Sequence, residues 1–200
     1  MPTMSHQDIT DLITKYSACK KCNLKDARDQ NNEDIFIGQG ALAADLLVVI
    51  PRPNFVDPQG PIAYEVDSDE YRMYKGITDK LGFDRQKIYI TATVACQPDL
   101  GCKIAVSNVV ACRPKMNDIL NIVNPKAVML MGPEALFSWT GEDIARSKFG
   151  RVESDKERIC YWSHDFSRYL EKKTKNQADG EKIANEIFKH WQELKELINE

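Results

Sequence analysis

The six cysteines are the residues of this chain whose type and spacing most clearly indicate chemistry. Cys19 and Cys22 form a C-x-x-C pair, from which two thiolates can reach one metal centre within a single turn. A redox dithiol has the same spacing, but thioredoxin-like pairs lie between a strand and a helix, whereas this pair follows a predicted helix and begins a polar segment. The cytosol keeps thiols reduced, and the chain has no recognisable secretory signal. The cysteines therefore predict metal or redox chemistry rather than a disulfide framework.

The length and composition of the chain limit the number of domains and the classes of partner. Two hundred residues, 42% of them hydrophobic, are enough for one core, so we expect a single domain over residues 1–200. The net charge of -3 gives no general attraction to nucleic acid, so binding to phosphates would need a local basic patch. No apolar run approaches the roughly 18 residues of a membrane span. We expect a cytoplasmic monomer without membrane contact.

Strand and helix patterns alternate along the chain and must position the cysteines. Short runs of branched apolar residues predict buried strands, and apolar residues at helical spacing predict the helices between them. This alternation favours an α/β fold with a mostly parallel central sheet and helices on both faces. Two polar segments, 19–34 and 171–177, are predicted as loops. The predicted strands are 45–50, 87–91, 127–131 and 158–162, and the predicted helices are 5–16, 71–81, 106–122, 133–139 and 183–198.

A series of short motifs, found in order between residues 19 and 168, resembles the family four uracil-DNA glycosylases, the iron-sulfur branch of that superfamily. The resemblance implies a three-layer α/β/α sandwich around a mostly parallel, four-stranded sheet. It also implies DNA as the partner. The motifs are Cys19-x-x-Cys22-x-Leu24 with Arg28, Gly38-Gln39-Gly40, Ala44-Asp45-Leu46-Leu47-Val48-Val49, Ile88-Tyr89-Ile90-Thr91, Cys96-Gln97-Pro98, Asn124-Pro125-Lys126, Met131-Gly132 and Ser163-His164.

The same resemblance assigns the cofactor. Cys112 follows Cys96 at an interval similar to that between the family's third and fourth cluster ligands. Zinc is the alternative, because tetrahedral sulfur ligation suits both. Cys102 is then a bystander, and Cys160, inside a predicted strand, behaves as a small buried hydrophobe. A 4Fe-4S cluster would be held by Cys19, Cys22, Cys96 and Cys112.

Two active-site motifs of the family are altered in this chain. The first is Gly-Glu-Ala-Pro-Gly after the first strand; here only Pro53 is kept, and Pro51 stands at the place of the glutamate. Asp57 is a candidate for the missing carboxylate, or else a solvated loop residue. The second is an asparagine that reads the extruded uracil, and its place is taken by Ala92, which has no side-chain hydrogen-bonding group. Tyr64 is a candidate for the stacking ring that the family has as phenylalanine.

The third motif, His-Pro-Ser, is partly kept. His164 stands at the place of the histidine that steadies the leaving base, although a surface histidine without a role is the alternative. His190 is predicted on the polar side of the last helix. A basic loop with interleaved aromatic residues follows His164 and suits contact with DNA phosphates, or is simply solvated. We assign catalysis to His164 and Asp57, and substrate binding to Asn54, Tyr64, Ala92, Arg168, Lys172 and Lys173.

Two hypotheses about function follow. In the first, the protein is a DNA base glycosylase with an altered pocket, which hydrolyses the N-glycosidic bond of a uracil-like or modified base. In the second, it is an inactive DNA-binding or scaffold protein that keeps the fold and the cluster. The loss of two polar motifs predicts weak activity, or none, on uracil, since each such contact commonly contributes a few kcal/mol to transition-state stabilisation.

Overall fold

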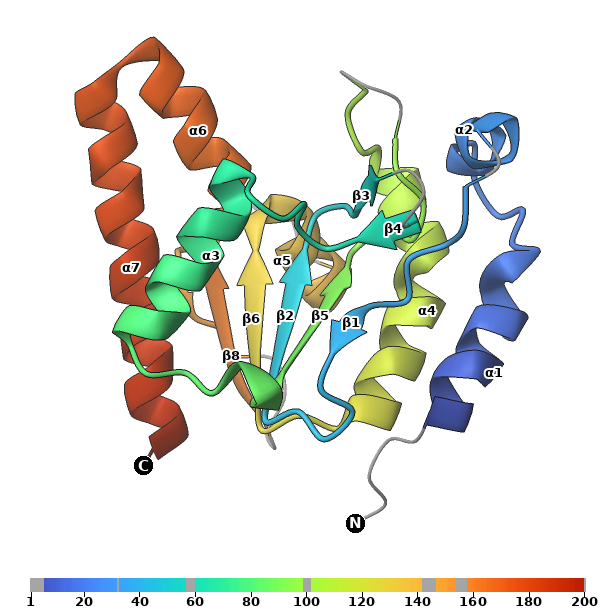
Figure 1. Ribbon diagram of the computed structural model, residues 1–200, viewed down its shortest axis with the longest axis horizontal. Helices are drawn as coiled ribbons and strands as arrows, with labels where there is room; N and C mark the ends of the chain where they lie inside the picture. The colour runs from blue at the N-terminus through green and yellow to red at the C-terminus, as the bar shows by residue number, and fades with distance from the viewer. Residues whose placement is uncertain are drawn as a thin grey trace.

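The fold is built around a central, mostly parallel sheet (Figure 1). The structure is a computed structural model, and it describes residues 6–31, 33–56, 60–98, 102–141, 147–153 and 158–199. The sheet has the order β1-β5-β2-β6-β8-β7. Its four central strands are parallel and confirm the predicted ones: β2 (Leu46–Ile50), β5 (Ile88–Ala92), β6 (Ala127–Met131) and β8 (Ile159–Ser163). Two short antiparallel strands, β1 (Gln39–Gly40) and β7 (Gly150–Arg151), extend its edges.

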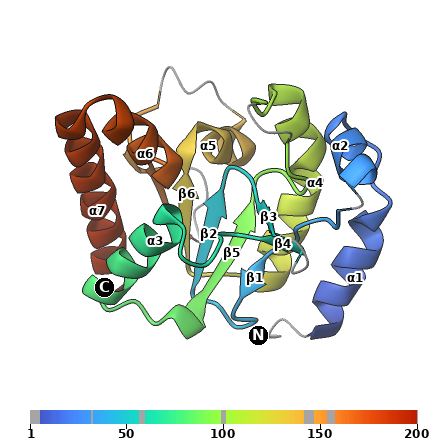
Figure 2. The same cartoon turned by 45° about the horizontal axis from the view of Figure 1, so that its top comes forward.

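Helices cover both faces of the sheet, as the sequence predicts (Figures 1 and 2). On one face lie α1 (His6–Ser17), α4 (Val106–Val123) and α5 (Gly132–Thr140), and on the other lie α3 (Asp69–Lys80), α6 (Phe166–Lys175) and α7 (Gln177–Asn199). Successive residues of β2 alternate between the two cores. Leu47 and Val49 pack toward α4 and α5, while Leu46 and Val48 pack toward α3 and α7. β2 is fully apolar because both of its faces are buried.

Two segments predicted as loops are helical, and those predictions are wrong. Within 19–34 the chain forms α2 (Leu24–Asn31), whose Leu24, Ala27 and Arg28 are buried. Their spacing of three and four residues is that of a helix face, which the otherwise polar composition obscures. The segment 171–177 belongs to the end of α6 and the start of α7. Asp165 begins α6 as its N-cap and accepts a hydrogen bond from the backbone N–H of Ser167 at 3.1 Å.

The carboxyl ends of the four parallel strands meet at one edge of the sheet, from which α5 and α6 begin (Figure 1). A hairpin of β3 (Asn54–Val56) and β4 (Gly60–Ile62) follows β2 at this edge. A turn of 3-10 helix, Arg85–Lys87, leads into β5 at the opposite edge. None of the helices in the described ranges is long and apolar enough to cross a bilayer.

Candidate functional site

The four cysteines expected to bind metal come from separate parts of the chain. Cys19 follows α1, and its backbone N–H donates to the Tyr16 carbonyl at 2.9 Å. Cys22 precedes α2, Cys96 lies beyond the end of β5, and Cys112 is on α4, as the sequence predicts. None of the six cysteines, all of which the structure describes, is in a disulfide; Cys160 is buried in β8 and Cys102 is exposed.

The four thiols are close enough to act on one another electrostatically. Burial raises the pKa of Cys96 to about 11, and the charges of Cys112, Cys22 and Cys19 add to that rise, against the opposing charge of Arg28. Burial likewise raises the pKa of Cys112, where Cys22 and Cys19 act in the same direction. In the part of the chain that the structure describes, no three Cys, His, Asp or Glu side chains are drawn together as ligands of a single metal ion.

Two buried cations flank these thiols. Arg28 is 5% exposed; its Nε and Nη2 donate to the Asp29 carboxylate at 3.0 and 2.6 Å, while its Nη1 is buried with no hydrogen-bond partner among the described residues. Burial acts to lower the pKa of Arg28, but the hydrogen bond to Asp29 and the neighbouring Cys96 outweigh it, so that pKa is raised.

Lys115, on α4, is the second of these cations. It is 1% exposed, and its Nζ donates to the Ala92 carbonyl at 2.6 Å. Burial lowers its pKa to about 8, whereas the charges of Cys112 and Cys96 act to raise it. A buried charge is costly unless it is paired. Four free thiols beside two buried cations and one unpartnered guanidinium nitrogen therefore fit an anionic iron-sulfur cluster.

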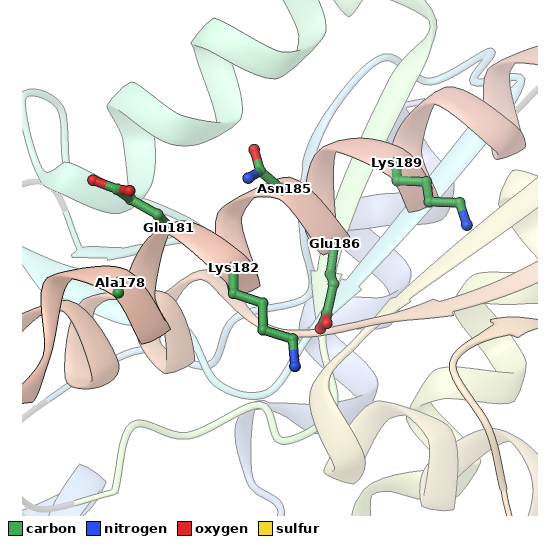
Figure 3. A pocket seen from close by; sticks show the side chains of 6 residues that line it. All are labelled: Ala178, Glu181, Lys182, Asn185, Glu186 and Lys189. Carbon is green, nitrogen blue, oxygen red and sulfur yellow. The ribbon is translucent and has the colours of Figure 1, made fainter.

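His164 lies at the carboxyl edge of the sheet, directly after β8. Its Nε2 is 2.9 Å from the Glu186 Oε2 of α7, and its ring packs on Phe149 with a centroid separation of 3.9 Å. Burial lowers the pKa of His164, with Glu186 acting in the opposite direction. Glu186 also lines a surface groove of about 460 Å³ formed by one side of α7 (Figure 3). Glu186 and Phe149 belong to no recognisable motif, so neither could be selected from the sequence alone.

His190 is not on the polar side of α7, so that prediction is wrong. The residue is only 9% exposed, and its Nδ1 lies 3.0 Å from the Ser163 hydroxyl at the end of β8. Burial lowers its pKa, and the charge of His164 adds to that effect. The rings of His190 and His164 lie 6.4 Å apart, and both pack near Phe149.

Of the residues expected to read the base, Asn54 and Ala92 have polar groups that are engaged within the protein. Asn54 donates its side-chain amide to the Ala63 carbonyl at 3.0 Å, across the β3–β4 hairpin. Ala92 is fully buried, and its carbonyl accepts the hydrogen bond from Lys115. Tyr64 is 6% exposed, and its ring packs against Tyr74 and Phe166 at centroid separations of 5.6 and 5.7 Å. Asp57 lies outside the described residues.

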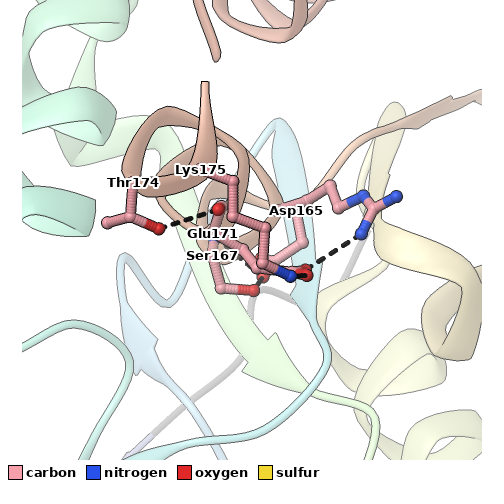
Figure 4. Close-up of polar contacts among 6 residues, drawn as sticks. Asp165, Ser167, Glu171, Thr174 and Lys175 are labelled. Atoms are coloured by element: carbon pink, nitrogen blue, oxygen red, sulfur yellow. Dashed lines mark hydrogen bonds and ion pairs between the residues drawn. The ribbon is translucent and has the colours of Figure 1, made fainter. Parts of the chain in front are cut away.

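The cationic residues expected to contact DNA are on α6 instead of on a loop. Glu171 pairs with Lys175 at 2.8 Å (Figure 4) and with Arg168 at 2.9 Å, so this carboxylate offsets part of the local positive charge. Lys173 lies over the Tyr169 ring at 5.5 Å. Lys172 is half-buried and Lys173 is exposed. A short exposed helix therefore presents the basic residues just beyond His164.

Comparison with known proteins agrees with this geometry. The sequence profile of the Uracil DNA glycosylase superfamily matches residues 37–190. The chain belongs to that superfamily. It is also similar to the Type-4 uracil-DNA glycosylase of Sulfurisphaera tokodaii, with 24% identity over 195 residues that cover 88% of this chain and 80% of the relative. Cys96, Cys112 and His164 lie within the matched region, whereas Cys19 and Cys22 precede it.

Proposed function

We propose that this protein is an iron-sulfur DNA base glycosylase whose pocket has diverged from uracil. The observation that carries the proposal is that two groups of residues lie at the same edge of the sheet in a superfamily fold. Cys96 follows β5, with Arg28 of α2 and Lys115 of α4 near it, and His164 follows β8. In open α/β sheets, ligands bind outside the carboxyl ends of the strands, so this edge is where a nucleotide would enter.

The proposed cofactor is a 4Fe-4S cluster held by Cys19, Cys22, Cys96 and Cys112. When bound, it supplies a rigid cross-link between α1, the start of α2, the segment after β5, and α4. Arg28 would donate its Nη1 hydrogens toward the cluster sulfurs, and Lys115 would offset negative charge from the side of the sheet. Zinc would be bound by the same thiolates, and analysis for iron, acid-labile sulfide and zinc separates the two.

DNA is the proposed partner. Arg168, Lys172 and Lys173 would contact backbone phosphates next to the extruded nucleotide, because a base must leave the duplex to reach a pocket of this kind. His164 would hydrogen-bond the leaving base. Burial favours its neutral form, and Glu186 fixes the orientation of the ring. Wild-type protein should therefore bind single- or double-stranded DNA more weakly as salt increases.

The altered pocket argues against efficient uracil excision. Ala92 presents no side-chain amide, and its carbonyl is already bonded to Lys115. A pocket built to hydrogen-bond its substrate loses most of its discrimination when that polar contact is missing. Modified bases are therefore the preferred substrates. The missing side-chain amide at Ala92 also favours the second candidate function, an inactive DNA-binding scaffold.

The test uses iron-loaded protein and oligonucleotides that each contain one uracil, hydroxymethyluracil, hypoxanthine or xanthine. Abasic sites are detected by alkaline cleavage, with an undamaged oligonucleotide as the control. Excision of a modified base that is lost in His164→Ala supports the enzyme. If no base is removed, but Lys172→Ala weakens DNA binding while Lys126→Ala, at an exposed position just before β6, does not, the scaffold is favoured. Rapid excision of uracil would contradict the altered pocket.

A further inference from the structure

Three strand ends converge around Gly132, which begins α5 with φ +82°. A Cβ atom at this position would lie 3.3 Å from Pro51 Cγ and from Asp165 Cβ, and 3.5 Å from Glu134 Oε2. Pro51 stands where the family has its glutamate. Glu134 on α5 and Asp165, the N-cap of α6, are thus brought to the place where the carboxylate after β2 is missing.

Asp165 has an environment unlike that of an ordinary helix cap. Its Oδ2 accepts hydrogen bonds from the backbone N–H and the hydroxyl of Ser167, which is its structural role. The residue keeps partial solvent contact at the edge of the sheet. Burial nevertheless raises its pKa, and the Glu134 charge adds to this rise against the lowering effect of the Ser167 hydrogen bonds. A raised pKa makes the Asp165 carboxyl better able to hold and donate a proton than an ordinary aspartate.

Tyr64 is a second, independent indication of a ligand-binding site near Asp165. It is 6% exposed, and its hydroxyl is buried without a hydrogen-bond partner among the residues described. Burial raises the pKa of Tyr64, and Asp165 is the charge that raises it most. The ring packs on Phe166, the residue next to Asp165. A buried hydroxyl left unpaired costs stability, so a polar ligand atom at this position would give it a partner.

We propose that Asp165, Glu134 and the Tyr64 hydroxyl form a two-carboxylate site for the sugar of an extruded nucleotide, replacing the carboxylate lost at Pro51. This inference rests on the proposed function. Cleavage of an N-glycosidic bond develops positive charge on the sugar, and carboxylates beside the ring stabilise that charge.

The reaction at this site balances as a hydrolysis. The bond between C1′ and the base nitrogen breaks, its electron pair leaves with the base, and Asp165 gives the base a proton. Water attacks C1′ and passes its proton to Glu134. Exchange of that proton with solvent, and reprotonation of Asp165, return both groups to their starting states. The substrate class is therefore a nucleotide in DNA whose base accepts a proton as it leaves.

The experiment compares the affinity of the full-length protein for two DNA duplexes. One contains a cationic pyrrolidine in place of the sugar, and the other contains a neutral tetrahydrofuran abasic analogue. Wild-type protein should prefer the cationic analogue by about tenfold or more, as expected for charge pairs in a desolvated site. Asp165→Asn and Glu134→Gln should each reduce that preference to below about threefold. Asparagine keeps the cap of α6, so a loss in Asp165→Asn is not a folding effect.

Two further variants make the result specific. Glu196→Gln removes one carboxylate from the exposed side of α7 and should keep the wild-type preference. Tyr64→Phe should weaken binding of both analogues without lowering the thermal unfolding temperature, because it removes an unpaired hydroxyl. Equal wild-type affinity for the two analogues would overturn the two-carboxylate site while leaving DNA binding intact. Failure to bind any DNA would overturn the proposed function itself.

Discussion

Replacing Arg28 by methionine tests whether the cysteine site is built around an anionic cluster. Arg28 is almost fully buried beside Cys96, and its Nη1 has no hydrogen-bond partner within the described ranges. Reduction adds one negative charge to a cluster, so a buried cation stabilises the reduced form more than the oxidised one. Removing the guanidinium should therefore make the reduction potential more negative.

The size of the shift follows from the contact that is lost. A hydrogen bond from a charged donor contributes about 1.5–3 kcal/mol, and no discount for solvent is needed because the side chain of Arg28 is only 6% exposed. For a one-electron couple, about 59 mV corresponds to about 1.4 kcal/mol. The expected shift is about 60–130 mV. The ion pair with Asp29 adds little to stability, since the Asp29 side chain is 51% exposed.

A redox titration followed by electron paramagnetic resonance measures this shift. Lys25→Met is the matched control, because Lys25 is on the same helix and pairs with Asp26 near the surface. That variant removes the same charge but should move the potential by less than about 20 mV, since exposed charges are screened. An Arg28→Met protein with full iron content and a potential within about 20 mV of wild type would show that Arg28 does not stabilise the reduced cluster.

Three further outcomes are expected. Cys96→Ser should remove the iron and the visible absorbance, whereas Cys102→Ser, at an exposed position, should keep both; equal iron content in the two would contradict the ligand assignment. Gly180→Ala places a Cβ 2.7 Å from the α6 backbone and should cost about 1–3 kcal/mol in urea unfolding, while Gly76→Ala on α3, with open space, should not destabilise. Burial lowers the pKa of His164, so the unfolded state binds more protons between that lowered pKa and the ordinary value of 6.5. Stability should therefore rise with pH through this window, and His164→Gln should flatten the rise in urea midpoints; an unchanged slope would contradict it.

The central strands were predictable because their burial leaves an unmistakable pattern. β6, Ala127–Met131, is apolar at every position since helices cover both of its faces, and its predicted bounds are confirmed. The edge strands β1 and β7 have two residues each, too few for any periodicity to be detected. In α6 only Phe166 is buried, so its polar composition resembles that of a loop although Asp165 caps it.

The site was predictable only where it matches a motif. The four cysteines and His164 are identified by spacing and resemblance, whereas Lys115 and Glu134 are not, because charged residues on helices are normally exposed. Lys115 is buried because α4 packs its side chain against the end of β5, where the Ala92 carbonyl accepts its hydrogen bond. Glu134 reaches the sheet edge because α5 begins directly at the end of β6. Both depend on tertiary contacts that no local pattern encodes.

The most direct test of the account is a single-turnover excision assay with iron-loaded protein in excess over DNA. The rates of abasic-site formation are compared between a uracil-containing oligonucleotide and the modified-base panel. At least one modified base should be removed much faster than uracil. Uracil removed as fast as, or faster than, every other base, or no removal of any base by protein that binds the DNA, would contradict it.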